Sequence, residues 1–154
     1  SNVLLLGAGG ASRAIIAGFA KEHVKKITVI NRTIEKANEL SKFGKNLEIE
    51  SDVIPIDDIK ALNENYDFIV NASSLGLNNE SNIIPTELID SNTTVYDIVY
   101  KPVNTALIKD SKKKNAEIIY GYEMLLSQAV RSFEIWLEQK APYEAMKKAI
   151  LGGF

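Results

Sequence analysis

Short apolar segments alternate with longer segments of helical periodicity along the chain, and this alternation limits the fold more than any other feature. We expect the apolar segments to be strands, at residues 3–6, 26–30, 47–53, 68–70, 94–99 and 117–120. We expect helices at residues 11–21, 33–42, 56–62, 103–114 and 124–139, with Gly44 ending the second, and a last short helix between Pro142 and the Gly152-Gly153 pair. Strands that alternate with helices pair in parallel through right-handed crossovers. The pattern therefore predicts an α/β fold, a doubly wound and mainly parallel sheet with helices on both faces.

The composition excludes several classes of function. Lysine and arginine number 18 against 20 aspartates and glutamates, and a net charge of −2 does not favour nucleic acid or an anionic membrane as partner. No apolar run approaches the roughly 18 residues of a membrane-spanning helix. The chain has no cysteine and one histidine, His23, so we expect no disulfide, no metal site and no Ser-His-Asp triad. We expect one cytoplasmic domain of 154 residues.

A glycine-rich loop, Gly7-Ala8-Gly9-Gly10-Ala11, lies between the first predicted strand and the first predicted helix. Glycine permits a tight turn at Gly7 and a close approach of a pyrophosphate to the backbone at Gly9. The N–H groups of the next helical turn then point toward the phosphates. Ser12 stands where the strict pattern has glycine or alanine, so the strand–loop–helix–strand context carries the prediction. The loop predicts the dinucleotide-binding unit of a Rossmann-like fold.

The end of the second predicted strand indicates which dinucleotide is bound. Sites specific for NAD usually carry an acidic residue there, which hydrogen-bonds the ribose 2′-hydroxyl. This chain has Asn31, Arg32 and Thr33 instead, with Lys36 one turn into the following helix. A guanidinium binds a 2′-phosphate through parallel charge-assisted bonds, whereas a carboxylate repels it. These four residues favour NADP(H) over NAD(H).

Five motifs follow one another along the chain. They are V-L-L-L-G-A-G-G-A-S-R-A at 3–14, N-R-T-I-E-K-A at 31–37, V-N-A-S-S-L-G-L at 70–77, Y-D-I-V-Y-K-P-V-N-T-A-L at 96–107 and G-Y-E-M-L-L-S-Q-A at 121–129. With these motifs the sequence resembles the shikimate dehydrogenase family over its whole length. The resemblance implies an NADP-dependent oxidoreductase of aromatic amino-acid biosynthesis that interconverts 3-dehydroshikimate and shikimate. It also implies an N-terminal substrate domain and a C-terminal NADP(H)-binding domain, and residues 1–154 resemble the second domain only.

The resemblance assigns roles to particular positions. Those implied to bind NADP(H) are Gly7, Ala8, Gly9, Gly10 and Ala11 at the pyrophosphate, Asn31, Arg32, Thr33 and Lys36 at the 2′-phosphate, Ser73 near the nicotinamide ribose, and Ile98 and Gly121 at the nicotinamide. Tyr100 and Gln128 match two positions through which this domain reaches the substrate. Tyr100 is alternatively a half-buried aromatic residue, and Gln128 an amide on a helix surface. We expect Met124 and Trp136 to serve packing.

The resemblance also implies what this chain lacks. The family uses a lysine and an aspartate to transfer the hydroxyl proton, and both lie in the N-terminal domain. We therefore expect no catalytic residue here, and we expect this chain to bind NADP(H) without turning over shikimate. His23 lies at the far end of the first predicted helix, away from the glycine loop, which favours a surface histidine.

One departure from the family pattern, two alternative functions and the oligomeric state stay open. Glu123 stands where many relatives have glycine, so it either perturbs cofactor affinity or points to solvent at a helix start. The chain is alternatively part of a quinate/shikimate dehydrogenase paralogue, or a stand-alone nucleotide-binding regulatory module. A homodimer is one candidate assembly.

Overall fold

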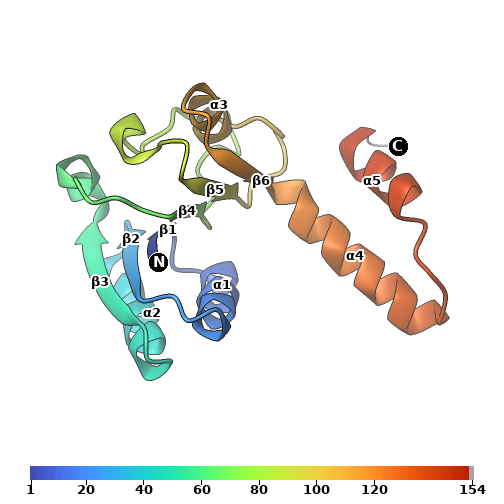
Figure 1. Cartoon of the computed structure of the whole chain (residues 1–154), viewed down its shortest axis with the longest axis horizontal. Coiled ribbons are helices and arrows are strands. Elements are labelled where there is room, and N and C mark those ends of the chain that lie inside the picture. Colours follow the sequence, from blue (N-terminus) through green and yellow to red (C-terminus); the bar gives the residue numbers. More distant parts are fainter. Residues whose placement is uncertain (153–154) are drawn as a thin grey trace.

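A six-stranded, wholly parallel sheet forms the centre of the computed structural model, which describes residues 1–152 (Figure 1). The strands are β1 (Asn2–Leu6), β2 (Lys26–Asn31), β3 (Glu50–Pro55), β4 (Phe68–Asn71), β5 (Thr94–Asp97) and β6 (Glu117–Tyr120). Their order in the sheet is β3-β2-β1-β4-β5-β6. The chain thus builds outward from β1 to β3, crosses back, and continues from β4 on the other side of β1. The predicted doubly wound α/β fold is confirmed.

Helices cover both faces of the sheet. Helices α1 (Gly10–Lys21) and α2 (Ile34–Asn46) lie on one face, and α3 (Ala106–Lys113) lies on the other with the short 3₁₀ helices η1 (Ile56–Ala61) and η2 (Thr86–Leu88). Helices α4 (Gly121–Leu137) and α5 (Tyr143–Gly152) follow β6. Of the Gly152-Gly153 pair expected beyond the last helix, Gly152 is instead the final residue of α5, and Gly153 lies outside the described residues.

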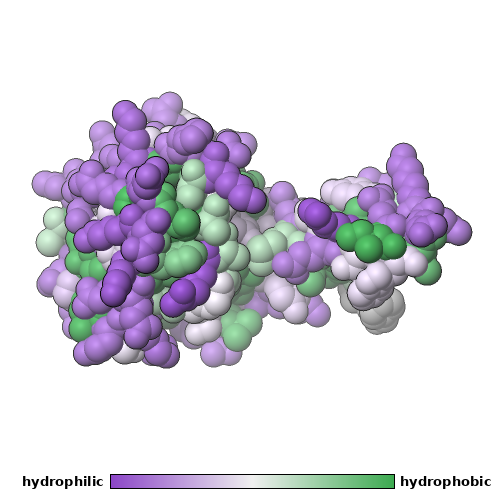
Figure 2. All heavy atoms as spheres, turned by 90° about the horizontal axis from the view of Figure 1, so that it is seen from below, coloured by the Kyte–Doolittle hydropathy of each residue, from purple (hydrophilic) through white to green (hydrophobic). Residues whose placement is uncertain are grey.

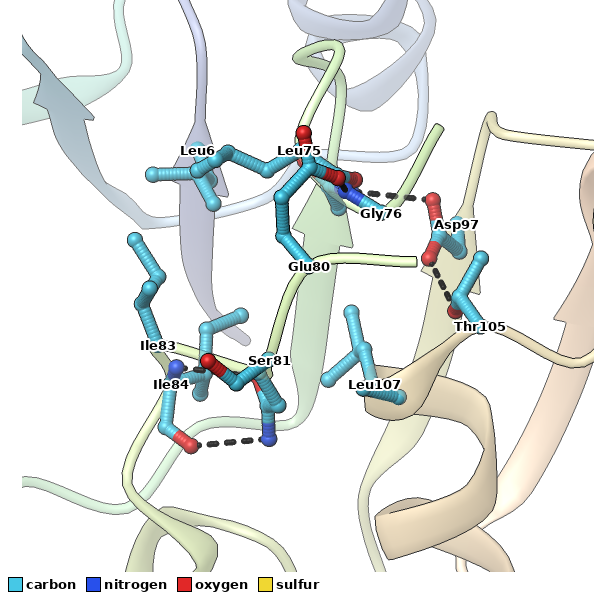
Figure 3. A pocket seen from close by; sticks show the side chains of 13 residues that line it. Leu6, Leu75, Gly76, Glu80, Ser81, Ile83, Ile84, Asp97, Thr105 and Leu107 are labelled. Atoms are coloured by element: carbon cyan, nitrogen blue, oxygen red, sulfur yellow. Dashed lines mark hydrogen bonds between the residues drawn. The ribbon is translucent and has the colours of Figure 1, made fainter. Parts of the chain in front are cut away.

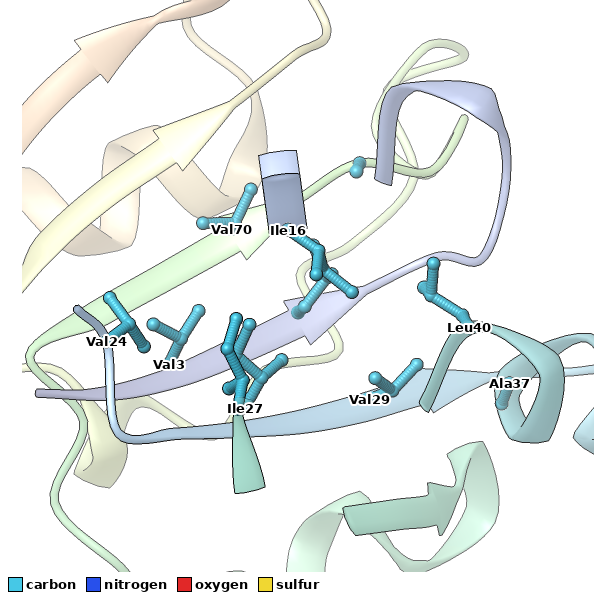
Figure 4. Close-up of a cluster of buried hydrophobic side chains, with 11 residues drawn as sticks. Val3, Ile16, Val24, Ile27, Val29, Ala37, Leu40 and Val70 are labelled. Carbon is cyan, nitrogen blue, oxygen red and sulfur yellow. The ribbon is translucent and has the colours of Figure 1, made fainter. Parts of the chain in front are cut away.

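Alternate residues of the central strand β1 enter two separate cores. Val3 and Leu5 pack in a cluster that includes Ile16 of α1 and Leu40 of α2 (Figure 4). Leu4 and Leu6 pack in the opposite cluster, to which α3 contributes Leu107 and the 3₁₀ helices contribute Ile59 and Leu88. Since β1 is buried on both faces, it reads as a continuous apolar run in the sequence.

The prediction that Gly44 ends the second helix is wrong. Gly44 lies inside α2 and is buried, because α2 packs there against Ser51 of β3 and Ile16 of α1. A Cβ at Gly44 would lie 3.6 Å from the Ser51 Cβ and 3.8 Å from the Ile16 Cγ2. The helix continues to Asn46, and Glu48 then takes the left-handed conformation, with φ of 64°.

Two other helix starts differ from prediction for local reasons. The helix expected at 103–114 begins at Ala106, because the Thr105 hydroxyl accepts a hydrogen bond from the Ile108 N–H and so caps the helix. Helix α4 begins at Gly121, directly after β6, rather than at Met124.

Helices α4 and α5 form an arm that projects from the body of the molecule (Figure 1). Along the arm, Ile135 is 63%, Trp136 78% and Leu137 55% exposed, and Figure 2 shows apolar side chains at its surface. No residue of α5 is buried.

Trp136 therefore does not serve packing within the described residues, and that prediction is wrong. Met124 packs in part: its sulfur accepts a hydrogen bond of 3.1 Å from the Tyr96 hydroxyl, while its side chain is 37% exposed.

Within residues 1–152, no helix combines the length and the apolar character needed to cross a membrane.

Candidate nucleotide-binding site

The fold requires glycine at position 7 whether or not a ligand binds. Gly7 follows β1 with φ of +106°, and a Cβ there would lie 2.7 Å from the Ala72 carbonyl oxygen. Its N–H donates a 2.8 Å hydrogen bond to the Ile30 carbonyl oxygen at the end of β2. The loop therefore turns in close contact with the ends of β2 and β4. This is the point where the strand order reverses, which is where doubly wound sheets bind ligands.

Gly9 and Gly10 have a different environment. A Cβ at either position would meet no heavy atom within 4 Å, and Gly9 has an ordinary φ of −95°. Gly9 is the N-cap of α1 and supplies no side chain, so the first-turn N–H groups of residues 10–12 have no partner among residues 1–152. Uncapped N–H groups beside open space form a site for an anionic group such as a phosphate.

Ser12 explains how this loop departs from the strict glycine pattern. Its side chain is fully buried, and the Ser12 hydroxyl donates a 2.9 Å hydrogen bond to the Gly7 carbonyl oxygen. The third position of the pattern requires a small residue because the helix packs closely on the strand. A buried serine meets that requirement and also ties α1 to the turn.

A group of basic and neutral polar side chains lies directly after β2. The Asn31 side-chain amide donates a 2.9 Å hydrogen bond to the Thr33 carbonyl oxygen, which orders the turn into α2. Arg32, Thr33 and Lys36 are exposed, and neither Arg32 nor Lys36 forms a salt bridge within residues 1–152. Glu35 is the acidic residue of the first turn of α2. Two unpaired cations at one helix start fit a phosphate monoester.

The loop after β4 is ordered by Asn71, which sequence reasoning missed. The Asn71 Oδ1 accepts hydrogen bonds from the Ser73 hydroxyl, at 2.6 Å, and from the Ser73 N–H, at 3.1 Å. The Asn71 Nδ2 donates to the Leu75 carbonyl oxygen at 2.8 Å. Ser73 is thus held in a defined conformation beside the glycine loop, whose Gly7 contacts the Ala72–Ser73 backbone.

A buried carboxylate, Asp97, stands at the end of the neighbouring strand β5 and was also missed. It is fully buried and accepts hydrogen bonds from the Asn71 side chain, the Val99 N–H and the Thr105 hydroxyl. Figure 3 shows the bond between Asp97 and Thr105. Burial raises the pKa of the Asp97 carboxyl, and the bonds from Thr105, Val99 and Asn71 oppose that shift. The only signal in the sequence was that Asn71 directly follows one apolar strand segment and that Asp97 interrupts the segment expected at 94–99.

Ile98 and Gly121 lie in contact. A Cβ at Gly121 would stand 2.5 Å from the Ile98 carbonyl oxygen and 2.7 Å from that of Asp97, so only glycine lets α4 start so close to the end of β5. The structure therefore brings together the two positions expected at the nicotinamide. Tyr100 is 42% exposed, and Gln128 is exposed on α4.

Glu123 caps the helix on which it lies. Its carboxylate accepts a 3.2 Å hydrogen bond from the Tyr120 N–H, immediately before the first residue of α4. A carboxylate in the first turn is also favoured by the helix dipole. The side chain at this departure from the family pattern thus bonds back to the helix start.

The loop between Ser73 and Ile84 closes over a small cavity. The cavity has a volume of about 20 Å³ and is lined by Asn71, Asp97 and Thr105 together with residues of the loop (Figure 3). That is room for about one water molecule and far too little for a nucleotide. The Glu80 carboxylate accepts hydrogen bonds from the N–H groups of Gly76, at 2.9 Å, and Asn78, at 3.1 Å, and so closes the loop on itself. The cavity is therefore part of the support beneath the site.

Two further kinds of functional group were considered in the sequence, a histidine and a metal site, and neither is found at this edge of the sheet among residues 1–152. His23 is exposed after the end of α1, with φ of 54°. Within residues 1–152, no three histidine, aspartate or glutamate side chains converge into a group that could bind a metal ion.

Sequence comparison places the chain among dehydrogenases. The family model described as Shikimate / quinate 5-dehydrogenase matches residues 1–98, and that of the Shikimate 5'-dehydrogenase C-terminal domain matches residues 121–151. The shikimate dehydrogenase (NADP(+)) of Nitrosopumilus maritimus is 60% identical over 154 residues, which are 100% of this chain and 56% of the relative.

Solved structures share the fold. A crystal structure of a shikimate dehydrogenase in complex with NADP+ has a TM-score of 0.80 at 34% identity, covering 98% of this chain and 54% of that one. The ligand-free 5-ketofructose reductase of Gluconobacter sp. strain CHM43 has a TM-score of 0.81 at 28% identity, covering 100% of this chain and 57% of that one. The chain spans about half the length of these relatives. Since the first family model covers the glycine loop and the carboxyl ends of β2, β4 and β5, the chain belongs to the shikimate / quinate 5-dehydrogenase family.

Proposed function

We propose that this chain is the NADP(H)-binding half of an NADP-dependent shikimate dehydrogenase, which converts 3-dehydroshikimate and NADPH into shikimate and NADP+. The name of the relative at 60% identity supports the reaction, and the share of that relative's length that the chain spans, 56%, supports assignment as one half. The observation that carries the proposal is the open cradle at Gly9 and Gly10, where neither glycine is needed by the protein itself.

Each end of the cofactor has residues that fit it. The first-turn N–H groups of α1 would bind the pyrophosphate, and Arg32 with Lys36 would bind the 2′-phosphate. Ser73, Ile98 and Gly121 would line the nicotinamide end, beyond the carboxyl ends of β4, β5 and β6 respectively. When bound, NADPH would supply the hydride for reduction of the substrate carbonyl.

The substrate would meet this chain at two exposed side chains. Tyr100 follows β5 and Gln128 lies on α4, so both stand on the elements that carry the nicotinamide-side residues. We assign no proton-transferring residue to this chain, since His23 lies past the far end of α1 from the glycine loop. That group would belong to the part of the relatives that this chain does not span.

The apolar arm supports the two-domain arrangement. Ile135, Trp136 and Leu137 are each more than half exposed, and such a group of large apolar side chains typically contacts another protein surface. We propose that an N-terminal substrate domain covers it. A quinate-specific enzyme is a second candidate, because the matching family model is named for both substrates.

Nucleotide titration tests the cofactor assignment. We expect this chain to bind NADPH more tightly than NADH, and Arg32→Ala to lose about 1.5–3 kcal/mol of NADPH affinity, roughly 10- to 150-fold, with little change for NADH. Binding is measured by the fluorescence of the reduced nicotinamide. Arg131→Ala, which removes an exposed arginine of α4, is the matched control and leaves both affinities unchanged. Equal binding of NADPH and NADH would exclude the 2′-phosphate site, and binding of neither would exclude the proposed function.

A further inference from the structure

The carboxylate of Asp97 connects three separate segments of the chain. Its Oδ1 accepts hydrogen bonds from the Val99 N–H and from the Asn71 Nδ2, both at 3.0 Å. Its Oδ2 accepts a 2.6 Å bond from the Thr105 hydroxyl. These partners belong to the loop after β5, the end of β4 and the start of α3. One side chain therefore links the loops that follow two neighbouring strands.

Asn71 extends this connection to the loop after β4. Asn71 lies opposite Asp97 in the parallel register, and it accepts both hydrogen bonds of Ser73 through its Oδ1. In addition, the Ile98 N–H donates a 3.0 Å hydrogen bond to the Asn71 carbonyl oxygen. A continuous network thus runs from Ser73 through Asn71 to Asp97, and from there to Val99 and Thr105.

Stability alone does not account for a carboxylate at this position. Asp97 is fully buried, so its carboxylate loses its hydration in the folded chain. Its three hydrogen-bond partners are neutral, so no cation offsets that loss. Val95, on the same strand, is buried with an apolar side chain. A carboxylate differs from such a residue in accepting several hydrogen bonds from different segments at once.

We propose that Asp97 is a positioning residue, which fixes Ser73 and Ile98 relative to each other so that both meet the nicotinamide half of NADP(H). This inference rests on the proposed function. The network touches none of the four residues at the end of β2, since its members lie on β4, β5 and the segments after them. Its loss therefore weakens contacts to the nicotinamide half and spares contacts to the 2′-phosphate.

Two ligands distinguish contacts to the nicotinamide half of NADP(H) from contacts to its 2′-phosphate end. NADPH carries both, whereas adenosine 2′,5′-bisphosphate carries the 2′-phosphate end and no nicotinamide. Thr105→Val removes the hydroxyl bonded to Asp97 and keeps the side-chain shape, and Thr105→Ser keeps the hydroxyl. Thr105→Val also removes the hydrogen bond that the hydroxyl accepts from the Ile108 N–H. We expect it to weaken NADPH binding about 5- to 10-fold, the scale of the one lost bond to Asp97, and to leave the affinity for the bisphosphate unchanged within about twofold. Thr105→Ser retains both affinities.

A matched control separates positioning from loss of stability. Ser111→Ala removes another buried hydroxyl of α3, which donates to the Leu107 carbonyl oxygen at 2.7 Å and does not contact Asp97. We expect it to leave both affinities unchanged even if it lowers the melting temperature. Asp97→Asn provides a second variant should Thr105→Val fail to fold, and we expect the same selective loss of NADPH affinity.

The outcomes are distinct. The positioning role is overturned if Thr105→Val and Asp97→Asn both lower the affinities for NADPH and the bisphosphate equally. It is also overturned if neither variant lowers either affinity. Equal effects of Thr105→Val and Ser111→Ala overturn it as well. If the unsubstituted chain binds neither NADPH nor the bisphosphate, the proposed function itself fails and the positioning role with it.

Discussion

Two glycines of one loop differ in whether the fold requires them. Gly7 has a positive φ and touches the Ala72 backbone, so the fold needs it whether or not a ligand binds. Gly9 has an ordinary φ and open space around it, so nothing in the fold needs it. At the scale of single residues, the space where a side chain would stand separates a glycine that the fold requires from one that it does not require.

Alanine substitutions at these two positions make this difference measurable. We expect Gly7→Ala to lower the free energy of unfolding by at least about 2 kcal/mol, because a Cβ forces both backbone strain and a clash. We expect Gly9→Ala to change that free energy by less than about 1 kcal/mol and to weaken NADPH binding at least about tenfold, since the methyl group occupies the cradle. Urea denaturation and NADPH titration measure the two quantities. The distinction is wrong if Gly9→Ala destabilises the chain as strongly as Gly7→Ala.

At the scale of elements, helices α2 and α4 show that the neighbouring elements decide whether a glycine can be replaced by a larger residue. Gly44 lies in α2 with ordinary van der Waals space around a Cβ, whereas Gly121 starts α4 against the backbone of β5. The sequence pattern placed Gly44 at a helix end and Gly121 outside the helix expected at 124–139. Only the neighbouring strand decides that the first tolerates a side chain and the second does not.

Substitutions in these helices should therefore change stability with opposite sign. We expect Gly44→Ala to raise the free energy of unfolding by about 0.5 kcal/mol, because alanine favours a helix and restricts the unfolded chain. Gly121→Ala should lower it by at least about 2 kcal/mol through overlap with the Ile98 carbonyl oxygen. Gly18→Ala in α1, where a Cβ meets nothing within 4 Å, is the control for helix propensity alone. Destabilisation by Gly44→Ala would show that α2 packs more tightly than the contacts indicate.

At the scale of the whole molecule, a sheet that is buried on both faces carries an arm whose apolar side chains are exposed. The two clusters around β1 bury the centre of the sheet on both faces, while α5 has no buried residue. The nucleotide-side residues thus lie on a body with its own core. The arm presents the apolar surface through which we propose contact with the substrate domain.

A turnover assay tests this division. We expect the 154-residue chain to bind NADPH and to show no NADP+ reduction with shikimate or quinate, because no proton-transferring residue is assigned to it. The measurement is absorbance of the reduced nicotinamide, with a full-length relative as the positive control. Measurable turnover by this chain alone would place the missing group within it and refute the two-domain proposal.

The alternation of strands and helices, the glycine loop and the cations after β2 were readable from the sequence, because each depends on residues close together in the chain. Strand ends were less well predicted: the segment expected at 94–99 pairs only to Asp97, where the polar network begins. Trp136 was misjudged because helical spacing shows which residues share a face and does not show whether anything covers that face.

Tertiary structure alone decided the roles of Gly44, Gly121, Asn71, Asp97 and Thr105. Asn71 and Asp97 are separated by 26 residues, and they meet only because β4 and β5 pair in this register. Local periodicity specifies which elements form, since it reflects the burial of one face of each element. Which polar groups share a bond is set by strand order and register, and these depend on how the elements pack together. Local sequence patterns therefore specify the fold class and predict NADP(H) as cofactor, whereas the packing of the sheet sets how the candidate site residues are supported.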